Sequence, residues 1–382
     1  MQDDKVQLDL GDNVSQQNVG TMKPVSRFAF VIHPLTAKQA AKRYPVAKLL
    51  PDPLIEKIMK GMKPQIVSEI KGVHSLTGAE TTGMFVGVPL TTSMMLGSVS
   101  TEHCYDIIAK AAEIAHAAGA QIVGLGAFTA VVGDGGISIA KRSPVPITTG
   151  NSYTVATAIE GVLKACAMIG VVPSESTVGI VGATGSIGRT CARVLHRHFK
   201  KTIVIGRDPA RTEAVACEVP GSVASTNLDD LLSADAVVTV SSAGEAIVEP
   251  RHLKPGSVVC DVSRPRDVSV RVAKERPDVL VIEGGVVKVP GHVDFGFDFG
   301  FPAQTAYACM CETMMLALEN RFECFTLGKD VSEKQVEETQ AWAKKHGFEL
   351  SGFRSFEKEV SEESIERVRA ARKSQERAPA VI

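Results

Sequence analysis

The sequence predicts an α/β protein in which an N-terminal α/β domain precedes a second α/β domain and a C-terminal helical segment. Short apolar runs alternate with longer segments of helix length, which is typical of a parallel or mixed sheet covered by helices. One predicted strand runs directly into a glycine-rich turn, Gly-Ala-Thr-Gly-Ser-Ile-Gly at 182–188. The length of 382 residues is that expected of two domains.

The composition is that of an ordinary globular protein, with 44% hydrophobic and 22% charged residues and a formal net charge of -1. This balance provides no overall positive field to neutralise phosphates, so it argues against a basic nucleic-acid-binding protein. No unbroken apolar run is long enough to span a membrane, and the chain does not open with a signal peptide. The eight cysteines are scattered without a C-x-x-C pair, which is typical of reduced thiols. We therefore expect a cytoplasmic protein with no transmembrane segment, no metal site and no nucleic-acid partner.

The N-terminal domain is predicted over 26–150, after a polar arm at 1–25 that shows no periodicity. Residues 27–33 form an apolar run that ends at a proline, which predicts a buried strand. Residues 100–119 begin with serine and threonine and end with glycine, as expected of a capped helix. The other expected elements are helices at 37–48 and 53–62 and strands at 66–70, 82–88 and 121–125.

The second domain is predicted over 151–330 and begins with an Ala-rich linking helix that ends near Gly170. The strand at 177–181, the glycine-rich turn and a helix at 185–199 follow. Later elements are strands at 202–205, 236–240, 257–261 and 279–283 and helices at 211–218 and 303–320. The remaining residues, 331–382, are predicted as helices at 333–346 and 362–371, with a charged end from 372 that frays.

The glycine-rich turn carries the spacing G-x-x-G-x-x-G between a strand and a helix, which is the context that a Rossmann nucleotide-binding domain requires. Gly182 permits the tight turn, Gly185 lets the backbone approach a pyrophosphate, and Gly188 lets the helix pack against the sheet. The N-terminus of the helix presents N–H groups and a positive dipole end to phosphates. A strand–turn–helix joint without a ligand is the alternative. The predicted NAD(P)-binding residues of the turn are Gly182, Ala183, Thr184, Gly185, Ser186, Ile187 and Gly188.

The second strand of this domain favours NADP(H) as the cofactor. It ends in Ile-Gly-Arg-Asp at 205–208, so Arg207 stands where NAD-binding proteins usually have an acid for the ribose 2′-hydroxyl. Arg211 follows one turn later, and guanidinium groups suit a 2′-phosphate. An Arg–Asp surface pair with Asp208 is the alternative. Small residues after a later strand, Ser241 and Ser242, would let a nicotinamide ring lie close, although ordinary loops also carry such residues.

Several collinear stretches carry a family resemblance: 124–129 (Gly-Leu-Gly-Ala-Phe-Thr), 148–154 (Thr-Thr-Gly-Asn-Ser-Tyr-Thr), the glycine-rich turn, 283–287 (Glu-Gly-Gly-Val-Val), 306–312 (Ala-Tyr-Ala-Cys-Met-Cys-Glu) and 345–348 (Lys-His-Gly-Phe). With them the chain resembles cyanobacterial long-chain acyl-[acyl-carrier-protein] reductases and their bacterial relatives. More distantly, the layout is similar to that of shikimate dehydrogenases. Those also have a catalytic domain before a Rossmann domain, an Asn-bearing linking helix, and a late helix whose Gln, here Gln304, faces the cleft.

The resemblance implies NADPH-dependent reduction of a fatty acyl thioester to an aldehyde, with acyl carrier protein or acyl-CoA as the acyl donor. It also implies a cysteine that takes the acyl group, and Cys309 matches that position. Such a nucleophile needs a lowered pKa near a helix N-terminus or a cation, which the helix at 303–320 could supply. The alternative is a small buried helix residue. Cys311 would face away from Cys309 and is expected to be structural.

Other residues are candidates for substrate contacts. Asn151 and Tyr153 begin the linking helix at the cleft, by analogy with shikimate dehydrogenases, and Asn151 could orient a carbonyl or simply cap the helix. His292 is a possible acid. A run of aromatic residues with period two, in which an extended chain would place all rings on one side, could line an acyl groove or pack on the sheet; it comprises Phe295, Phe297, Phe299 and Phe301. This run and the tail beyond Phe348 depart from the family pattern.

Two other functions compete with the acyl-thioester reductase. One is an NADP-dependent dehydrogenase of a small hydroxy or amino acid, which would not depend on Cys309. The other is a nucleotide-binding regulator that binds the cofactor but catalyses no reaction.

Overall fold

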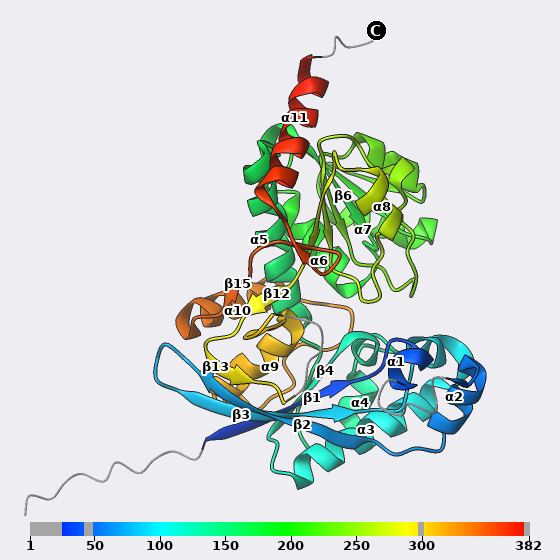
Figure 1. Ribbon diagram of the computed structural model, residues 1–382, viewed down its shortest axis with the longest axis vertical. Helices are drawn as coiled ribbons and strands as arrows, with labels where there is room; N and C mark the ends of the chain where they lie inside the picture. The colour runs from blue at the N-terminus through cyan, green and yellow to red at the C-terminus, as the bar shows by residue number, and fades with distance from the viewer. Residues whose placement is uncertain (1–24, 42–48, 297–301, 378–382) are drawn as a thin grey trace, which may run out of the picture.

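Two six-stranded sheets organise the computed structural model, which describes residues 25–41, 49–296 and 302–377. Each sheet forms the centre of one lobe, and helix α5 (Asn151–Ile169) runs between the lobes (Figure 1). The predicted fold class, an α/β protein with a Rossmann domain and C-terminal helices, is confirmed.

The second sheet has the strand order β11-β10-β9-β6-β7-β8, with every neighbouring pair parallel. When these six strands are numbered in chain order and the sheet is read from β8 to β11, the order is 3-2-1-4-5-6, which is the Rossmann order. Its strands are β6 (Thr177–Val181), β7 (Lys201–Ile205), β8 (Ser222–Ser225), β9 (Ala236–Thr239), β10 (Val258–Asp261) and β11 (Leu280–Glu283). Its helices are α6 (Ser186–Leu195), α7 (Pro209–Glu218) and α8 (Val270–Glu275).

The first sheet has the order β13-β2-β3-β1-β4-β5 and mixes parallel and antiparallel pairs. Successive residues of β1 (Ser26–Ile32) alternate between two cores: Phe28 and Phe30 belong to one, and Ala29 and Val31 to the other. The remaining strands are β2 (Gln65–His74), β3 (Glu80–Gly87), β4 (Ile122–Leu125), β5 (Ile147–Thr148) and β13 (Gly291–Asp294). The helices of this part of the chain are α1 (Ala37–Ala41), α2 (Asp52–Met59), α3 (Thr101–Ala117) and α4 (Ile137–Arg142).

The chain returns to the first lobe after completing the second, which corrects the predicted second domain of 151–330. Strand β13 pairs with β2 at the edge of the first sheet, and helix α9 (Ala308–Leu318) packs on β1, β3 and β4. Helix α9 begins later than the predicted 303 because residues 305–307 pair with β12 (Val286–Lys288) as strand β14 (Thr305–Tyr307).

The C-terminal helices pack along α5 rather than forming a separate domain. Helix α10 (Glu333–His346) has the predicted bounds, and α11 (Glu362–Arg377) continues past residue 372, where fraying was expected. The short strands near them are β15 (Glu349–Leu350), β16 (Arg354–Ser355) and β17 (Lys358–Glu359).

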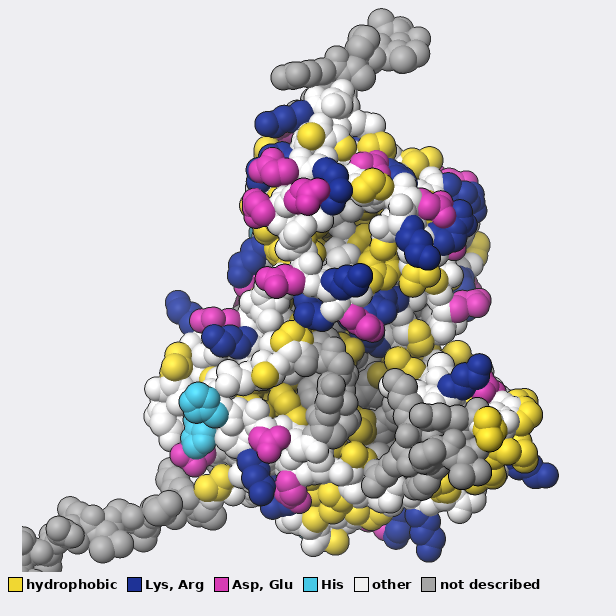
Figure 2. Space-filling view, viewed as in Figure 1, with side chains coloured by type: hydrophobic (Ala, Val, Ile, Leu, Met, Phe, Trp, Pro, Cys, Tyr) yellow, Lys and Arg dark blue, Asp and Glu magenta, His cyan; other side chains and the backbone are white. Residues whose placement is uncertain are grey.

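On the face shown in Figure 2, acidic and basic side chains are intermixed over the upper lobe, so no field of a single sign develops there. None of the helices in the described ranges combines the length and the apolar character that crossing a bilayer requires.

Candidate active site

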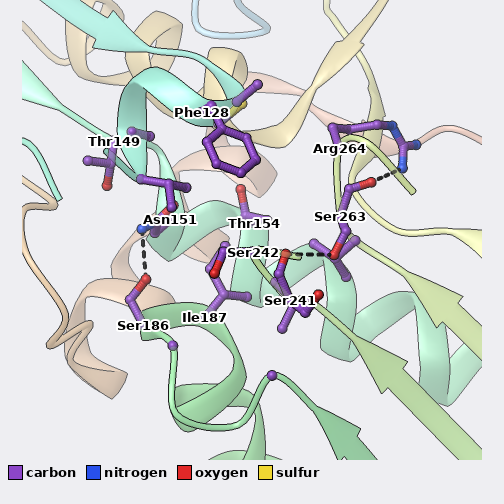
Figure 3. Close-up of a pocket in the computed structure, with 18 of the residues that line it drawn as sticks. Phe128, Thr149, Asn151, Thr154, Ser186, Ile187, Ser241, Ser242, Ser263 and Arg264 are labelled. Carbon is purple, nitrogen blue, oxygen red and sulfur yellow. Dashed lines mark hydrogen bonds between the residues drawn. The ribbon is translucent and has the colours of Figure 1, made fainter. Parts of the chain in front are cut away.

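A cavity of about 740 Å³ is lined by residues of both lobes and of the segment that starts α9. One wall contains the glycine-rich turn after β6 and the loops after β7 and β9, and another contains residues of β1, β3 and the loop after β4. In Figure 3, Phe128 of the loop after β4 lies across the cavity from Ser186 and Ile187. Ligands of open α/β sheets bind at this edge, beyond the carboxyl ends of the strands.

The glycine-rich turn has the close packing that its sequence predicts. Gly182 has a φ of 79°, and a Cβ there would lie 2.5 Å from the carbonyl oxygen of Val240. A Cβ on Gly188 would lie 2.4 Å from the carbonyl oxygen of Gly182, so α6 starts directly against the turn. The turn therefore forms a cradle of backbone that suits a pyrophosphate. Gly182, Thr184, Gly185, Ser186 and Ile187 line the cavity, while Ala183 and Gly188 lie outside its lining.

The two arginines after β7 also line the cavity. Arg207 is exposed and has no hydrogen-bond or ion-pair partner among the described residues. Asp208 is not its partner: the Asp208 carboxylate caps α7 by accepting the Arg211 backbone N–H at 2.9 Å. The Arg211 side chain donates to the carbonyl oxygen of Thr184 at 3.5 Å. The surface pair considered as an alternative is therefore absent, and the Arg207 guanidinium is available to a ligand.

The loop after β9 brings Ser241 and Ser242 to the cavity. Ser241 is fixed by the buried carboxylate of Asp267, which accepts its backbone N–H at 2.7 Å and its hydroxyl at 2.6 Å. The same carboxylate accepts the hydroxyls of Thr239 and Ser263, each at 2.6 Å. The network holds the ends of β9 and β10 in one arrangement.

Asn151 does not cap the linking helix, although capping was the simpler alternative. The N-cap is Gly150, which has a φ of 73° and no side chain. The Asn151 amide instead donates to the hydroxyl of Ser186 at 3.0 Å (Figure 3). It thereby links the start of α5 to the start of α6 across the cavity that both residues line.

The capping role belongs to Glu312 of α9, which the sequence did not indicate. Its carboxylate is fully buried and accepts the backbone N–H of Tyr153 at 3.0 Å, in the first turn of α5. It also accepts the hydroxyls of Thr148 at 2.6 Å and Thr326 at 3.0 Å. Burial raises the pKa of Glu312, and these hydrogen bonds oppose the rise. One carboxylate therefore ties α9 to the start of α5.

We expect Glu312→Ala to lower the free energy of unfolding by about 3–5 kcal/mol, because it leaves several buried donors without an acceptor and opens a cavity. Glu312→Gln keeps the size and one carbonyl oxygen and should cost less than half as much. Urea unfolding of both variants measures the difference. Equal losses in the two variants would contradict this expectation, because Glu312→Gln keeps the volume, and would show that the carboxylate itself is required.

Cys309 lies in the first turn of α9 and lines the cavity. It is partly exposed, whereas Cys311 is buried, as expected. Gly150 allows this close approach, since a Cβ there would lie 2.2 Å from the Cys309 Cα. Burial raises the pKa of the Cys309 thiol to about 12, against the lowering effects of the Met310 backbone N–H and the Arg264 guanidinium. The expected lowered pKa is therefore wrong for the protein without ligands, and the thiol is protonated at neutral pH.

Among the described residues, the other predicted substrate residues do not line the cavity. Tyr153 is buried in the core, and burial raises the pKa of its hydroxyl. Gln304, with a φ of 62°, places its amide nitrogen 3.4 Å from Nδ1 of the exposed His292. Phe295 packs on Phe85 with ring centroids 6.2 Å apart, in agreement with the packing alternative. Phe297, Phe299 and Phe301 lie outside the described residues.

The apolar wall of the cavity comes instead from residues that the sequence did not single out: Phe30, Ile32, Leu35, Phe85, Phe128, Ala130 and Val131. His33 shapes this wall, because its Nε2 accepts the Phe128 backbone N–H at 3.1 Å and its Nδ1 donates to the carbonyl of Pro34 at 3.0 Å. Burial lowers the pKa of His33 to about 4. His33 is therefore neutral at physiological pH and positions the loop that carries Phe128.

Comparison with known proteins adds three findings. Residues 167–283 match the family model of shikimate / quinate 5-dehydrogenases. The chain is 30% identical over 301 residues to aminotransferase PigE of a Serratia species, an alignment that covers 77% of the chain and 35% of the relative. It is 26% identical over 302 residues to long-chain acyl-[acyl-carrier-protein] reductase of Synechococcus elongatus, covering 75% of the chain and 87% of the relative.

The chain thus spans about a third of the length of the Serratia relative. Among solved structures, glutamyl-tRNA reductase of Methanopyrus kandleri superimposes with a TM-score of 0.28 and 23% identity, over 49% of this chain and 47% of that one. The Rossmann strand order, the glycine-rich turn and the matched family model together support an NAD(P)-dependent oxidoreductase.

Proposed function

We propose that this protein is an NADPH-dependent reductase that converts a fatty acyl thioester to an aldehyde through an acyl group bound to Cys309. The observation that carries the proposal is the shared cavity: one wall has a backbone cradle that suits a dinucleotide, another is apolar, and Cys309 also lines it. The relative from Synechococcus elongatus, named as a long-chain acyl-[acyl-carrier-protein] reductase, supports the substrate class.

The residues of the cavity suit this chemistry. The aromatic and aliphatic side chains around Phe128 provide a surface on which a hydrocarbon chain can be buried. In acyl transfer, the Cys309 sulfur forms a bond to the carbonyl carbon of the donor thioester, and the bond from that carbon to the donor sulfur breaks. The thiol proton of Cys309 passes to the departing sulfur, so the protonated resting state is compatible with the net reaction.

The glycine-rich turn and Arg207 would hold the dinucleotide, which when bound supplies the hydride that reduces the acyl group to the aldehyde. Asn151 and Ser186 of the turn contact each other in the cavity that Cys309 also lines, and so can orient groups bound there. Breaking the bond between the acyl carbon and the Cys309 sulfur leaves a thiolate, which takes one proton from solvent to become the thiol again.

Arg207→Ala is expected to raise KM for NADPH roughly 10–100-fold, because a charge-assisted contact with the 2′-phosphate is lost. KM for NADH should change less than threefold. Initial rates with both cofactors measure the ratio, and Arg271→Ala on α8, which is 60% exposed and outside the cavity lining, is the matched control. A parallel rise for NADPH and NADH would contradict the assignment of Arg207 to the 2′-phosphate.

The decisive test of the function is mass spectrometry of the protein after incubation with a long-chain acyl-CoA or acyl carrier protein, without the dinucleotide. We expect an acyl adduct on the peptide that contains Cys309. Addition of NADPH should then remove the adduct and release one aldehyde per acyl group. No adduct and no aldehyde with either donor would refute the proposal.

The match of 167–283 to shikimate / quinate 5-dehydrogenases favours a second candidate, an NADP-dependent dehydrogenase of a small hydroxy or amino acid. It predicts reversible reduction of NADP by a polar acid and full activity in a variant without Cys309. The apolar wall of the cavity favours the acyl substrate over this one.

A further inference from the structure

Arg264 is a buried cation in the cavity that Cys309 also lines, and neither the sequence motifs nor the comparisons indicate it. It follows β10 in the loop at 262–269 and lines the cavity together with Tyr307 and Cys309. Its side chain is 13% exposed. A buried guanidinium is costly unless its donors are satisfied and its charge is matched, so its surroundings indicate what it does.

The guanidinium is held in one orientation by two contacts. Nη1 donates to the carbonyl oxygen of Ser263 at 2.7 Å (Figure 3), and Nε donates to the hydroxyl of Tyr307 at 3.1 Å. The guanidinium carbon also lies 5.5 Å from the centroid of the Tyr307 ring. Because Tyr307 is the N-cap of α9, these contacts tie the cation to the helix turn that carries Cys309.

One nitrogen of this side chain makes no hydrogen bond. Nη2 is buried and has no hydrogen-bond acceptor among the described residues. The nearest carboxylate oxygen, Oε2 of Glu283, is 3.6 Å away. The other oxygen of Glu283 accepts Nη2 of Arg266 and the backbone N–H of Glu357, each at 2.8 Å.

The other two carboxylates of this region accept hydrogen bonds from other donors. Asp261 accepts the backbone N–H groups of Ser263 and Val268, each at 3.0 Å. Asp267 accepts the hydroxyl and backbone donors around Ser241 described above. Arg264 is therefore a fixed cation that pairs with Glu283 at 3.6 Å and whose Nη2 makes no hydrogen bond among the described residues.

Cys309 is the nucleophilic group that lines the same cavity, in the helix turn whose N-cap, Tyr307, binds Arg264. The titratable groups that act on its thiol are Arg264, which favours the thiolate, and the buried Glu312 of the same helix, which opposes it. The neighbouring Cys311 is buried and held in the thiol form, because burial raises its pKa.

We propose that Arg264 stabilises the negative charge that develops on the Cys309 sulfur as the thiol loses its proton, and so activates Cys309 as a nucleophile. The use of the activated thiol for acyl transfer rests on the proposed function. The effect of Arg264 on the reactivity of Cys309 does not, because it is a property of the protein without ligands. Arg264 acts here through Cys309, so it is a positioning and electrostatic residue for the reaction.

The test is the pH dependence of iodoacetamide alkylation at Cys309, measured peptide by peptide in the full-length protein without cofactor or substrate. In Arg264→Gln we expect the rate at Cys309 to fall at least about tenfold at a given pH, equivalent to a shift of about one pH unit in the profile. Arg264→Lys keeps the charge and should stay within about threefold of the wild type. The exposed Cys217 in the same samples reports any general change in reactivity.

Arg276→Gln is the matched control, because Arg276 is another partly buried arginine that binds backbone carbonyls and Asp278 but does not line the cavity. It should leave alkylation of Cys309 unchanged. An unchanged pH profile in a folded Arg264→Gln, or equal losses in the Gln and Lys variants, would overturn the proposal. This result can be told apart from a failure of the proposed function. If the proposed function is wrong, the wild type forms no acyl adduct, but the effect of Arg264 on alkylation of Cys309 remains.

Discussion

Cys309→Ser is expected to lower the rate of aldehyde formation from an acyl thioester at least about 1000-fold, while the affinity for NADPH stays within about twofold of the wild type. The loss follows because a serine hydroxyl without an adjacent base is a far weaker nucleophile toward a thioester than a thiol is. Steady-state assays with gas-chromatographic detection of the aldehyde measure the first quantity, and fluorescence titration with NADPH measures the second.

The matched control for this substitution is Cys217→Ser, since Cys217 is exposed on α7 and outside the cavity lining. It should retain full activity and full acyl loading. Retained activity in Cys309→Ser, with a melting temperature close to that of the wild type, would exclude the covalent route and favour the small-acid dehydrogenase.

Gly188→Ala is expected to weaken NADPH binding at least about 100-fold and to destabilise the protein by about 1–3 kcal/mol. The added methyl group would lie 2.4 Å from the carbonyl oxygen of Gly182 and 2.8 Å from its carbon. Both are backbone atoms of the turn, so α6 must move away from the turn and carry its N–H groups with it. Calorimetric titration with NADPH and urea unfolding measure the two effects.

Alanine substitutions at two further glycines provide comparisons for this result. Gly61→Ala meets only the carbonyl oxygen of Ile58, at 3.6 Å, and should be nearly neutral. Gly185→Ala meets the carbonyl oxygen of Gly182 at 3.3 Å and should have an intermediate effect. If Gly188→Ala bound NADPH as the wild type does, the close packing of turn and helix would not be needed for the site.

The Rossmann lobe could be predicted from the sequence because its signals are local. The run at 177–181 is β6 residue for residue, and the close approach of Gly188 is to Gly182 of the same turn. The return of β13 to the first sheet could not be predicted, because its partner β2 lies more than 200 residues earlier. The start of α9 was placed too early for a related reason: pairing with β12 holds 305–307 in a strand.

The same distinction applies to the site. The glycine-rich turn and the arginines after β7 were found from the order of residues, whereas Cys309 was singled out only through a family resemblance. Glu312 and His33 were missed because their partners are donors far away in the chain, such as Thr148 for Glu312 and Phe128 for His33. Periodicity carries no information about such pairs.

The return of the chain to the first sheet has a consequence for synthesis on the ribosome. The aromatic face of β1, with Phe28 and Phe30, is made first but is covered by α9, which is made some 280 residues later. All strands of the second sheet lie between residues 177 and 283, so this sheet can assemble before α9 is made. We therefore expect the lobe encoded first to be completed last, with its apolar face open to chaperones in the meantime.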